Sequence, residues 1–455
     1  MVDLEILKFL PEIIQISELK AEKIIHGDRQ HFQGETMLES LRTHSGSWLN
    51  RLYKSDNIFA MKDLIDKGYR SSIDLIYIDP PFCTMANYKN RIEVLYDKSR
   101  EVLEYPAYTD IWKGGLKEYL EMLSLRIFLM KELLSDRGST YIHLDFRTVH
   151  YVKIMMDCIF GRENFLNEVI WSYKSGGTSN RYYSRKHDTI LVYTKGKNYI
   201  FNPQKEKSYN RGLKPYGFKN VKEYEDNMGW YTLVNAKDVW SINMVGRTAK
   251  ERVGYGTQKP EALLERIILC SSDEDSIVAD FFAGSGTTAI VAEKHNRRWI
   301  TSDIGDMSIS TIKKRLYNIS GNPYKLLSQE KRYMKIGIGI KSMEKIGVEG
   351  EKIKVEIDLD GYDLDLNSLK LNKSTQVKVE EIIKNNPLTL IEYIGIGYKY
   401  NNDSSIIIHE VYRDKDSLTI DSKISFEVLR EFADKLFIKV VDIFGNESYK
   451  ILEKI

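Results

Sequence analysis

The chain has 455 residues, more than one hydrophobic core usually serves, so two or three domains are expected. Its apolar content of 42% is ample for a globular core, and a formal net charge of +2 does not by itself indicate nucleic-acid binding. Three widely separated cysteines (Cys83, Cys158 and Cys270) exclude a zinc-ligand spacing and indicate reduced thiols in a cytoplasmic protein. The N-terminus lacks the basic start and apolar run of a signal peptide, and no stretch is long enough to span a membrane.

The first strong feature is a buried strand that ends at Asp79. Residues 71–78 read Ser-Ser-Ile-Asp-Leu-Ile-Tyr-Ile, a nearly continuous apolar run that is typical of a parallel sheet. Pro80 and Pro81 cannot extend a hydrogen-bonded ladder, so the chain must leave the sheet there, and Phe82 follows. Ligands bind outside the carboxyl ends of such strands, although an ordinary Asp-Pro turn is equally open on this stretch alone.

Strands and helices alternate along the rest of the first two-thirds of the chain. A short strand near residue 51 is followed by a helix that Asp56 is expected to cap. Residues 83–112 look irregular and predict an exposed loop close to Asp79. Further strands are expected at 139–144, 169–173, 189–193, 276–282 and 298–303, and further helices at 116–134, 148–160, 261–270, 287–294 and 304–317. This alternation predicts a doubly wound α/β domain.

Between Trp171 and Gln258 the periodicity fades, and basic and aromatic residues interleave. This segment holds 16 Lys and Arg against seven Asp and Glu, a net charge of +9 that leaves −7 for the remainder. Such a local excess suits a phosphate backbone, with a solvated lysine-rich surface as the plainer alternative. Beyond residue 330 the pattern alternates and predicts a separate β-rich domain. Within it, Val355 to Leu366 reads as a half-exposed strand, although its acids keep a calcium site open.

A second candidate site joins the strand at 276–282 to the next helix. Its residues are Asp280, Phe281, Phe282, Ala283, Gly284, Ser285, Gly286, Thr287 and Thr288. Glycines there allow a tight turn close to a ligand, and Asp303, at the end of the next strand, is placed to grip ribose hydroxyls. The P-loop lysine and the third glycine of the dinucleotide fingerprint are missing. Hydroxyls and helix N–H groups suit a small carboxylate better than a pyrophosphate, so S-adenosylmethionine fits best.

A methyl donor gives Asp79 a chemical role. The exocyclic amino group of adenine is a poor nucleophile because its lone pair is delocalised into the ring. Asp79 and the carbonyl of Pro80 could accept hydrogen bonds from the two N–H groups, while Pro81 stiffens the loop. The ring of Phe82 offers a stacking face for the base, which would have to be flipped out of a duplex.

These motifs resemble those of the β-class amino-methylating DNA methyltransferases of the restriction-modification type. That family has the catalytic motif Asp/Asn/Ser-Pro-Pro-Tyr/Phe/Trp and a cofactor motif centred on Phe-x-Gly-x-Gly. Here they are residues 79–82 and 282–286, in the β-class order of catalytic region, recognition region and cofactor region. Gln258-Lys259-Pro260 before a helix resembles the family's motif beside the methionine part of the cofactor. Residues 141–145, 160–165 and 168–171 also match.

The resemblance implies that residues 79–82 hold the target amino group. It implies further that residues 280–288, Asp303, Lys259 and Pro260 hold S-adenosylmethionine. An acid at position 79, rather than Ser, favours N6 of adenine over N4 of cytosine. The residues after Phe82 depart from the family's usual Asn-Thr-Gly. No metal site is expected, and His143, Asp145 and the His187-Asp188 pair are interpreted as structural, with Trp171 as a core ring.

The predicted molecule is thus an α/β protein with a Rossmann-like, S-adenosylmethionine-dependent methyltransferase domain acting on double-stranded DNA. Its expected parts are an N-terminal extension (1–50), a catalytic half (51–171), a target-recognition region (172–257), a cofactor-binding half (258–325) and a C-terminal β-rich domain (330–455). Residues 440–446 also resemble tails of methylases that work beside helicase-like subunits. Three readings stay open: cytosine N4 methylation, a homodimer, and a DNA-binding modification subunit active only within a restriction or defence complex.

Overall fold

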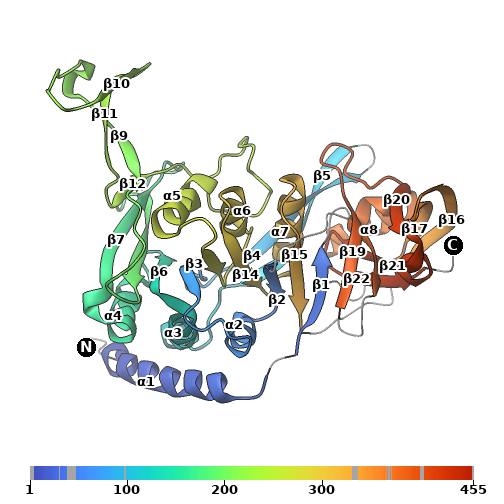
Figure 1. Cartoon of the computed structure of the whole chain (residues 1–455), viewed down its shortest axis with the longest axis horizontal. Coiled ribbons are helices and arrows are strands. Elements are labelled where there is room, and N and C mark those ends of the chain that lie inside the picture. Colours follow the sequence, from blue (N-terminus) through green and yellow to red (C-terminus); the bar gives the residue numbers. More distant parts are fainter. Residues whose placement is uncertain are drawn as a thin grey trace.

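A central sheet of 14 strands organises the residues that this computed structural model describes: 5–29, 31–37, 48–96, 99–329, 337–364, 366, 369, 371–399 and 404–452. Figure 1 shows the sheet running through the length of the molecule. In spatial order its strands are β12 (Val239–Ser241), β7 (Phe165–Ser172), β8 (His187–Thr194), β6 (Leu134–Leu144), β3 (Ile73–Ile78), β13 (Ile277–Asp280), β14 (Arg298–Asp303), β2 (Asn50–Lys54), β15 (Tyr324–Ser328), β1 (Gln33–Met37), β19 (Ser404–Tyr412), β18 (Ile391–Lys399), β21 (Leu436–Asp442) and β22 (Glu447–Ile451).

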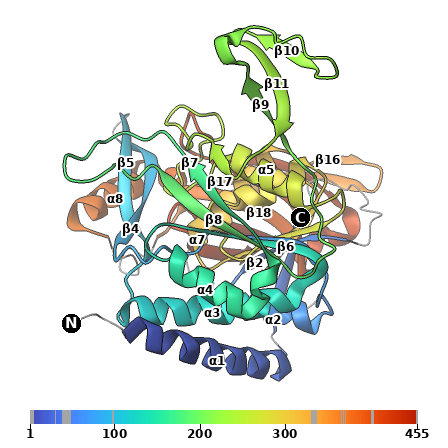
Figure 2. The same ribbon diagram turned by 90° about the vertical axis from the view of Figure 1, so that its left-hand side faces the viewer.

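Helices cover both faces of the parallel part of this sheet (Figure 1). One face carries α2 (Asn57–Asp66), α3 (Gly115–Leu133) and α4 (Val149–Phe160), with α1 (Glu5–His26) as an outer layer across α3 (Figure 2). The other face carries α5 (Glu261–Ser271), α6 (Thr287–Lys294) and α7 (Asp306–Asn318). The doubly wound α/β prediction is confirmed.

In the middle of the sheet, neighbouring strands run parallel because helices connect them across the faces of the sheet; in spatial order they are β6, β3, β13, β14, β2 and β15. They are buried on both sides: five of the six residues of β3 are buried, which explains the continuous apolar run before Asp79. Asp56 caps α2 as expected, since its carboxylate accepts a hydrogen bond from the Ile58 amide at 2.8 Å.

The prediction of an irregular loop over residues 83–112 was wrong. Most of this stretch is an antiparallel hairpin of β4 (Asn87–Tyr96) and β5 (Ser99–Thr109). Its apolar face is short, with Ile92, Val94 and Leu103 as its buried residues, and these pack against the C-terminal region. A strand whose partner surface lies hundreds of residues away has too sparse an alternation to be recognised from its own sequence.

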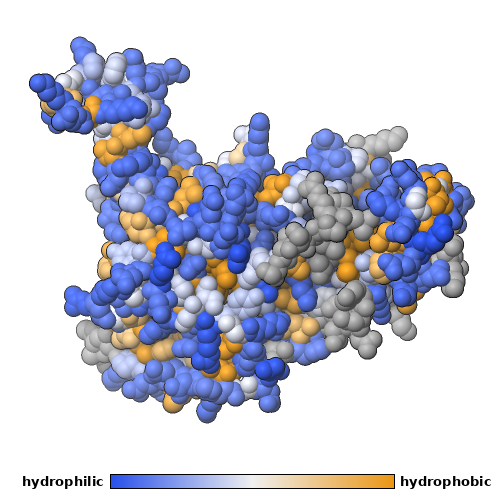
Figure 3. All heavy atoms as spheres, in the orientation of Figure 1, coloured by the Kyte–Doolittle hydropathy of each residue, from blue (hydrophilic) through white to orange (hydrophobic). Residues whose placement is uncertain are grey.

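The predicted recognition region carries a projecting arm. Strands β9 (Lys205–Tyr209), β10 (Glu223–Asp226) and β11 (Gly229–Asn235) form a small antiparallel sheet that stands out from the body (Figures 1 and 2). The face of the arm seen in Figure 3 is mostly hydrophilic. Strand β8, in contrast, belongs to the central sheet, and β12 returns the chain to its edge.

The C-terminal region is rich in strands, but it is not detached from the central sheet. Strands β16 (Ile338–Glu349), β17 (Lys352–Tyr362) and β20 (Lys423–Leu429) form a sheet of their own, beside α8 (Lys373–Asn385). Burial alternates along β17, as expected of a half-exposed strand. Strands β18, β19, β21 and β22 continue the central sheet through β1, so the division into five domains stays a prediction.

No helix in the described part of the chain has the length and apolar character needed to cross a membrane.

Candidate active site

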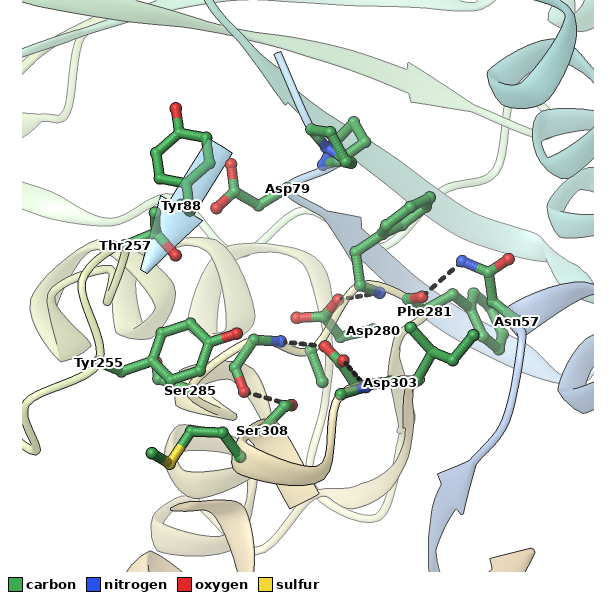
Figure 4. A pocket seen from close by; sticks show the side chains of 18 of the residues that line it. Asn57, Asp79, Tyr88, Tyr255, Thr257, Asp280, Phe281, Ser285, Asp303 and Ser308 are labelled. Carbon is green, nitrogen blue, oxygen red and sulfur yellow. Dashed lines mark hydrogen bonds between the residues drawn. The ribbon is translucent and has the colours of Figure 1, made fainter. Parts of the chain in front are cut away.

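Three neighbouring parallel strands end in carboxylates at one edge of the central sheet. Asp79 follows β3, Asp280 is the last residue of β13, and Asp303 is the last residue of β14. Strand β13 lies between the other two, so their carboxyl ends open into the same space (Figure 4). The sheet edge that the sequence predicted as a ligand site therefore gathers both candidate motifs.

This space is a cavity of about 630 Å³. Most of the site residues predicted from the sequence line it: Asp79, Pro80, Pro81, Phe82, Lys259, Asp280, Phe281, Phe282, Ala283, Gly284, Thr287, Thr288 and Asp303. Gly286 and Pro260 are not among the lining residues; they are the N-cap residues of α6 and α5.

Asp79 has two oxygens in different surroundings. Oδ2 accepts a hydrogen bond from Lys259 Nζ in an ion pair that is mostly buried. Oδ1 is fully buried, and no other described residue supplies it with a hydrogen-bond donor. A buried carboxylate oxygen without a partner is costly, so it indicates a place where a ligand donates. The sequence had placed Lys259 beside the cofactor; its pairing with Asp79 was not predicted.

Phe82 faces an aromatic and imidazole cluster. Its ring centroid lies 5.8 Å from that of His143 and 5.5 Å from Lys259 Nζ. His143 is fully buried, bonds to the Tyr77 hydroxyl through Nδ1 at 2.9 Å, and approaches Asp188 through Nε2 at 3.3 Å. These contacts hold one side of the Phe82 ring, and Phe82 also lines the cavity.

Asp110 holds the loop that follows Phe82, a role that the sequence did not reveal. Its Oδ1 accepts hydrogen bonds from the Cys83 amide and from Trp112 Nε1, at 3.2 and 2.8 Å. Its Oδ2 accepts from the amide and the hydroxyl of Thr84, at 2.8 and 2.7 Å. Because Asp110 lies beyond the β4–β5 hairpin, these bonds tie the end of the hairpin to the loop that follows Phe82.

The glycine turn is shaped by positive backbone angles and by Asp303. Gly284 has φ +50° and Gly286 has φ +74°, and a Cβ at Gly286 would clash with Ile312 of α7. Asp303 Oδ2 accepts from the Gly284 amide and Oδ1 from the Gly305 amide, both at 2.8 Å (Figure 4). The Asp303 carboxylate thus fixes the turn, and Asp303 also lines the cavity.

Comparison with known proteins identifies the family. The family model of an N6/N4 DNA methylase matches residues 73–314, just over half of the chain. The chain belongs to this family. The likeness stated from the sequence motifs is therefore confirmed, as is the dependence on S-adenosylmethionine.

Several relatives of this DNA methylase are known. The type II methyltransferase M.HpaI of Haemophilus parainfluenzae is 30% identical over 267 residues, 58% of this chain and 74% of the relative. The type II methyltransferase M.HinfI of Haemophilus influenzae is 26% identical over 84% of this chain and 98% of the relative, well beyond the residues of the family model. The DNA adenine methyltransferase YhdJ of Escherichia coli (strain K12) is 29% identical over 54% and 76% of the two chains.

The electrostatics of the methylase cavity favour a cation. Burial raises the pKa of Asp280 to about 7, against the hydrogen bonds from Thr288 and the Phe282 amide that lower it, and the charges of Asp79 and Asp303 raise it further. Burial also raises the pKa of Asp303. S-adenosylmethionine carries a sulfonium and an ammonium group, so these residues fit it. Among the described residues, no cluster of His, Cys, Asp and Glu could hold a metal ion.

The amide of Asn57 supports the glycine turn from behind, and sequence reasoning missed it. Its Nδ2 donates to the Phe281 carbonyl at 2.8 Å, and its Oδ1 accepts from Arg126 Nε at 2.5 Å. Arg126 also bridges to Asp56 at 3.0 Å. The available signal was the Asp56-Asn57 pair at the carboxyl end of a strand, where polar side chains gather around a ligand site in this fold.

Proposed function

We propose that this DNA methylase transfers a methyl group from S-adenosylmethionine to N6 of an adenine in double-stranded DNA. The observation that carries the proposal is the buried Asp79 Oδ1, to which no other described residue donates, at a strand end that faces the glycine turn. An acceptor of this kind matches the N–H group of an exocyclic amine.

The cofactor is proposed to lie along the glycine turn, between Asp280 and Asp303. Asp280 would receive the ammonium group, and Asp303 the ribose hydroxyls. Lys259 and Pro260 would border its methionine part, with the N–H groups of Thr287 and Thr288 at the start of α6 available to its carboxylate. When bound, S-adenosylmethionine supplies an electrophilic methyl group on its sulfonium.

Asp79 would prepare the amino nitrogen for attack. Its Oδ1 and the Pro80 carbonyl accept the two N–H groups, which draws the nitrogen's lone pair out of the ring. The nitrogen's lone pair would then form the bond to the methyl carbon, the electron pair of the breaking carbon–sulfur bond would stay on sulfur, and an N–H proton would leave toward Asp79 or solvent. Lys259 keeps Oδ2 paired, so the Asp79 carboxylate is held in one orientation.

The transfer would be direct, without a covalent bond between enzyme and base. Cys83 is the cysteine nearest in sequence to the motif, but burial and the charge of Asp110 raise the pKa of its thiol. A protonated thiol is a poor nucleophile. Proximity and alignment of the amine and the methyl group supply the remaining acceleration.

DNA recognition is assigned to residues 172–257, whose net charge of +9 suits a phosphate backbone. A base within a duplex cannot reach a cavity behind Phe82, so the target would be flipped out and stacked on that ring. Adenine is favoured over cytosine by the acid at position 79 and by the likeness to an adenine methyltransferase of Escherichia coli.

The decisive experiment is expression in a host that lacks adenine methylation, followed by hydrolysis of its DNA and identification of the modified base. N6-methyladenine in one sequence motif is expected. N4-methylcytosine would overturn the adenine assignment. DNA binding with turnover only after a restriction or helicase partner is added would favour a modification subunit instead.

A further inference from the structure

The turn between β21 and β22 reaches the active-site cavity from the far end of the chain. Its Phe444 side chain is 7% exposed and lines the cavity. Asp442 Oδ1 accepts hydrogen bonds from the Phe444 and Asn446 amides at 2.8 and 2.9 Å. Its Oδ2 accepts from Asn446 Nδ2 and from the Tyr362 hydroxyl, at 2.8 and 3.2 Å. The Asp442 carboxylate is thus satisfied within the turn, and the position of Phe444 is fixed.

The same turn is fastened to the loop that follows Asp303. Gly445 has φ +90°, and a side chain there would clash with Asp306. Lys54 joins the two segments, with ion pairs of 2.5 Å to Asp306 and 2.9 Å to Glu447. Glu447 also pairs with Lys439 at 2.9 Å, and the Lys439 side chain is 2% exposed. Partly buried ion pairs of this kind fix geometry and resist the screening that weakens surface pairs.

The β4–β5 hairpin closes the cavity beside this turn, and the C-terminal region holds it in place. Tyr105 of β5 lines the cavity and meets Phe444 edge-to-face at 5.5 Å. Arg413 Nη1 donates to the Glu93 carbonyl at 2.9 Å, and Lys378 forms an ion pair with Glu101. The hairpin that follows the catalytic motif therefore has its partner surface in the C-terminal region.

At this end of the cavity, apolar side chains lie beside the carboxylates of Asp303 and Asp306, and Asp306 is paired with Lys54. Ile304, Met307 and Phe444 line this end immediately beyond Asp303. A flat aromatic ring attached to a ribose matches that order of groups, because Asp303 would hold the hydroxyls and the apolar side chains the ring faces.

We infer that the C-terminal region is part of the cofactor site: Phe444 forms the wall on which the adenine ring of S-adenosylmethionine packs. The inference rests on the proposed position of the cofactor along the glycine turn. In this inference Phe444 acts on binding of the cofactor, whereas Asp79 acts on the amino group of the base. The C-terminal region therefore contributes to cofactor affinity in addition to any role that it has in DNA binding.

The test is Phe444→Ala in the full chain, with S-adenosylhomocysteine as the calorimetric probe. Loss of an aromatic contact to a base predicts a Kd about tenfold higher. Phe444→Tyr, which keeps the ring, should stay within twofold of wild type. The matched control is Phe432→Ala, which removes a ring stacked on Tyr398 at 4.0 Å in the same region but away from the cavity lining. It should leave the Kd unchanged.

The outcomes separate this inference from the proposed function. A folded Phe444→Ala protein whose Kd stays within twofold of wild type overturns the inference, as does a loss confined to DNA affinity. If Phe444→Ala does not fold, the Kd of Phe444→Leu tests the same contact, because leucine keeps the apolar volume and lacks the aromatic ring faces. Wild-type protein that binds S-adenosylhomocysteine but makes no N6-methyladenine contradicts the proposed function alone.

Discussion

The two ends of the active-site cavity differ in how their carboxylates are satisfied. At the glycine turn, Asp280 accepts from the Phe282 amide and the Thr288 hydroxyl, and both oxygens of Asp303 accept from backbone amides. At the catalytic loop, Asp79 has one oxygen paired with Lys259 and one to which no other described residue donates. The carboxylates at the proposed cofactor end are satisfied by the chain's own donors, whereas the proposed catalytic end leaves one carboxylate oxygen as the acceptor that we assign to the substrate.

Removing the acceptor at the catalytic end should have the largest effect. Asp79→Asn keeps the shape of the side chain but puts a neutral amide where the anion stood. Loss of one such electrostatic contact is expected to lower kcat by about 10² to 10³-fold. Transfer of radiolabelled methyl groups to DNA measures the rate, and calorimetry measures the Kd for S-adenosylmethionine, which should change by less than threefold.

Asp74→Asn is the control, because Asp74 lies on β3, the strand that Asp79 follows, and accepts a hydrogen bond from Ser135 Oγ at 2.8 Å, away from the cavity. Its activity should match wild type. Equal activity of Asp79→Asn and wild type would rule out the assigned role of Asp79.

The cofactor end should be most sensitive at Gly286. Gly286→Ala combines a left-handed φ of +74° with a clash against Ile312, so the start of α6 must shift. Strain of this kind costs of the order of 1–3 kcal/mol, and the Kd for S-adenosylmethionine should rise at least tenfold.

Gly68→Ala is the control that separates backbone strain at a positive φ from displacement of a neighbouring side chain. Gly68 has φ +85°, but nothing lies within 4 Å of a Cβ placed there. It should lower Tm slightly and leave cofactor affinity intact. A Gly286→Ala protein with wild-type affinity for S-adenosylmethionine would contradict the view that the glycine turn has its binding geometry before the cofactor arrives.

Cofactor affinity should depend on pH through Asp280. Burial raises the pKa of Asp280 to about 7 in the free protein, and a bound cation favours the ionised form. Binding of the cofactor below pH 7 therefore releases a proton from Asp280. As the pH falls below 7, the affinity for the cofactor should decrease by up to about tenfold per pH unit, and above pH 8 it should not change with pH. Calorimetry between pH 5.5 and 8.5 measures this slope.

Asp280→Asn should bind more weakly at pH 8 and lose the slope. A slope that persists in this variant would place the titration elsewhere, with Asp303 as the next group to test, because burial raises its pKa as well.

The sequence predicted most of what lies within one strand or one motif. The strand predicted at 298–303 has the same bounds in the structure, and both motifs come to the same sheet edge. Contacts between distant segments were not predictable. Lys259 pairs with Asp79 across 180 residues, and the apolar face of the β4–β5 hairpin packs against the C-terminal region. No local periodicity encodes such partners.

The smallest expected effect lies on the basic segment, and it should act on DNA while sparing the cofactor end. Arg181 is exposed between β7 and β8, where a guanidinium can meet a phosphate. Arg181→Ala should weaken DNA binding by a few-fold and reduce the salt slope of binding by about one. Lys345→Ala removes the same charge from β16 and should leave the slope unchanged. Because Arg181 is not among the residues that line the cavity, the Kd for S-adenosylmethionine should be the same in both variants. A rise with Arg181→Ala would mean that this part of the basic segment is coupled to the cofactor end.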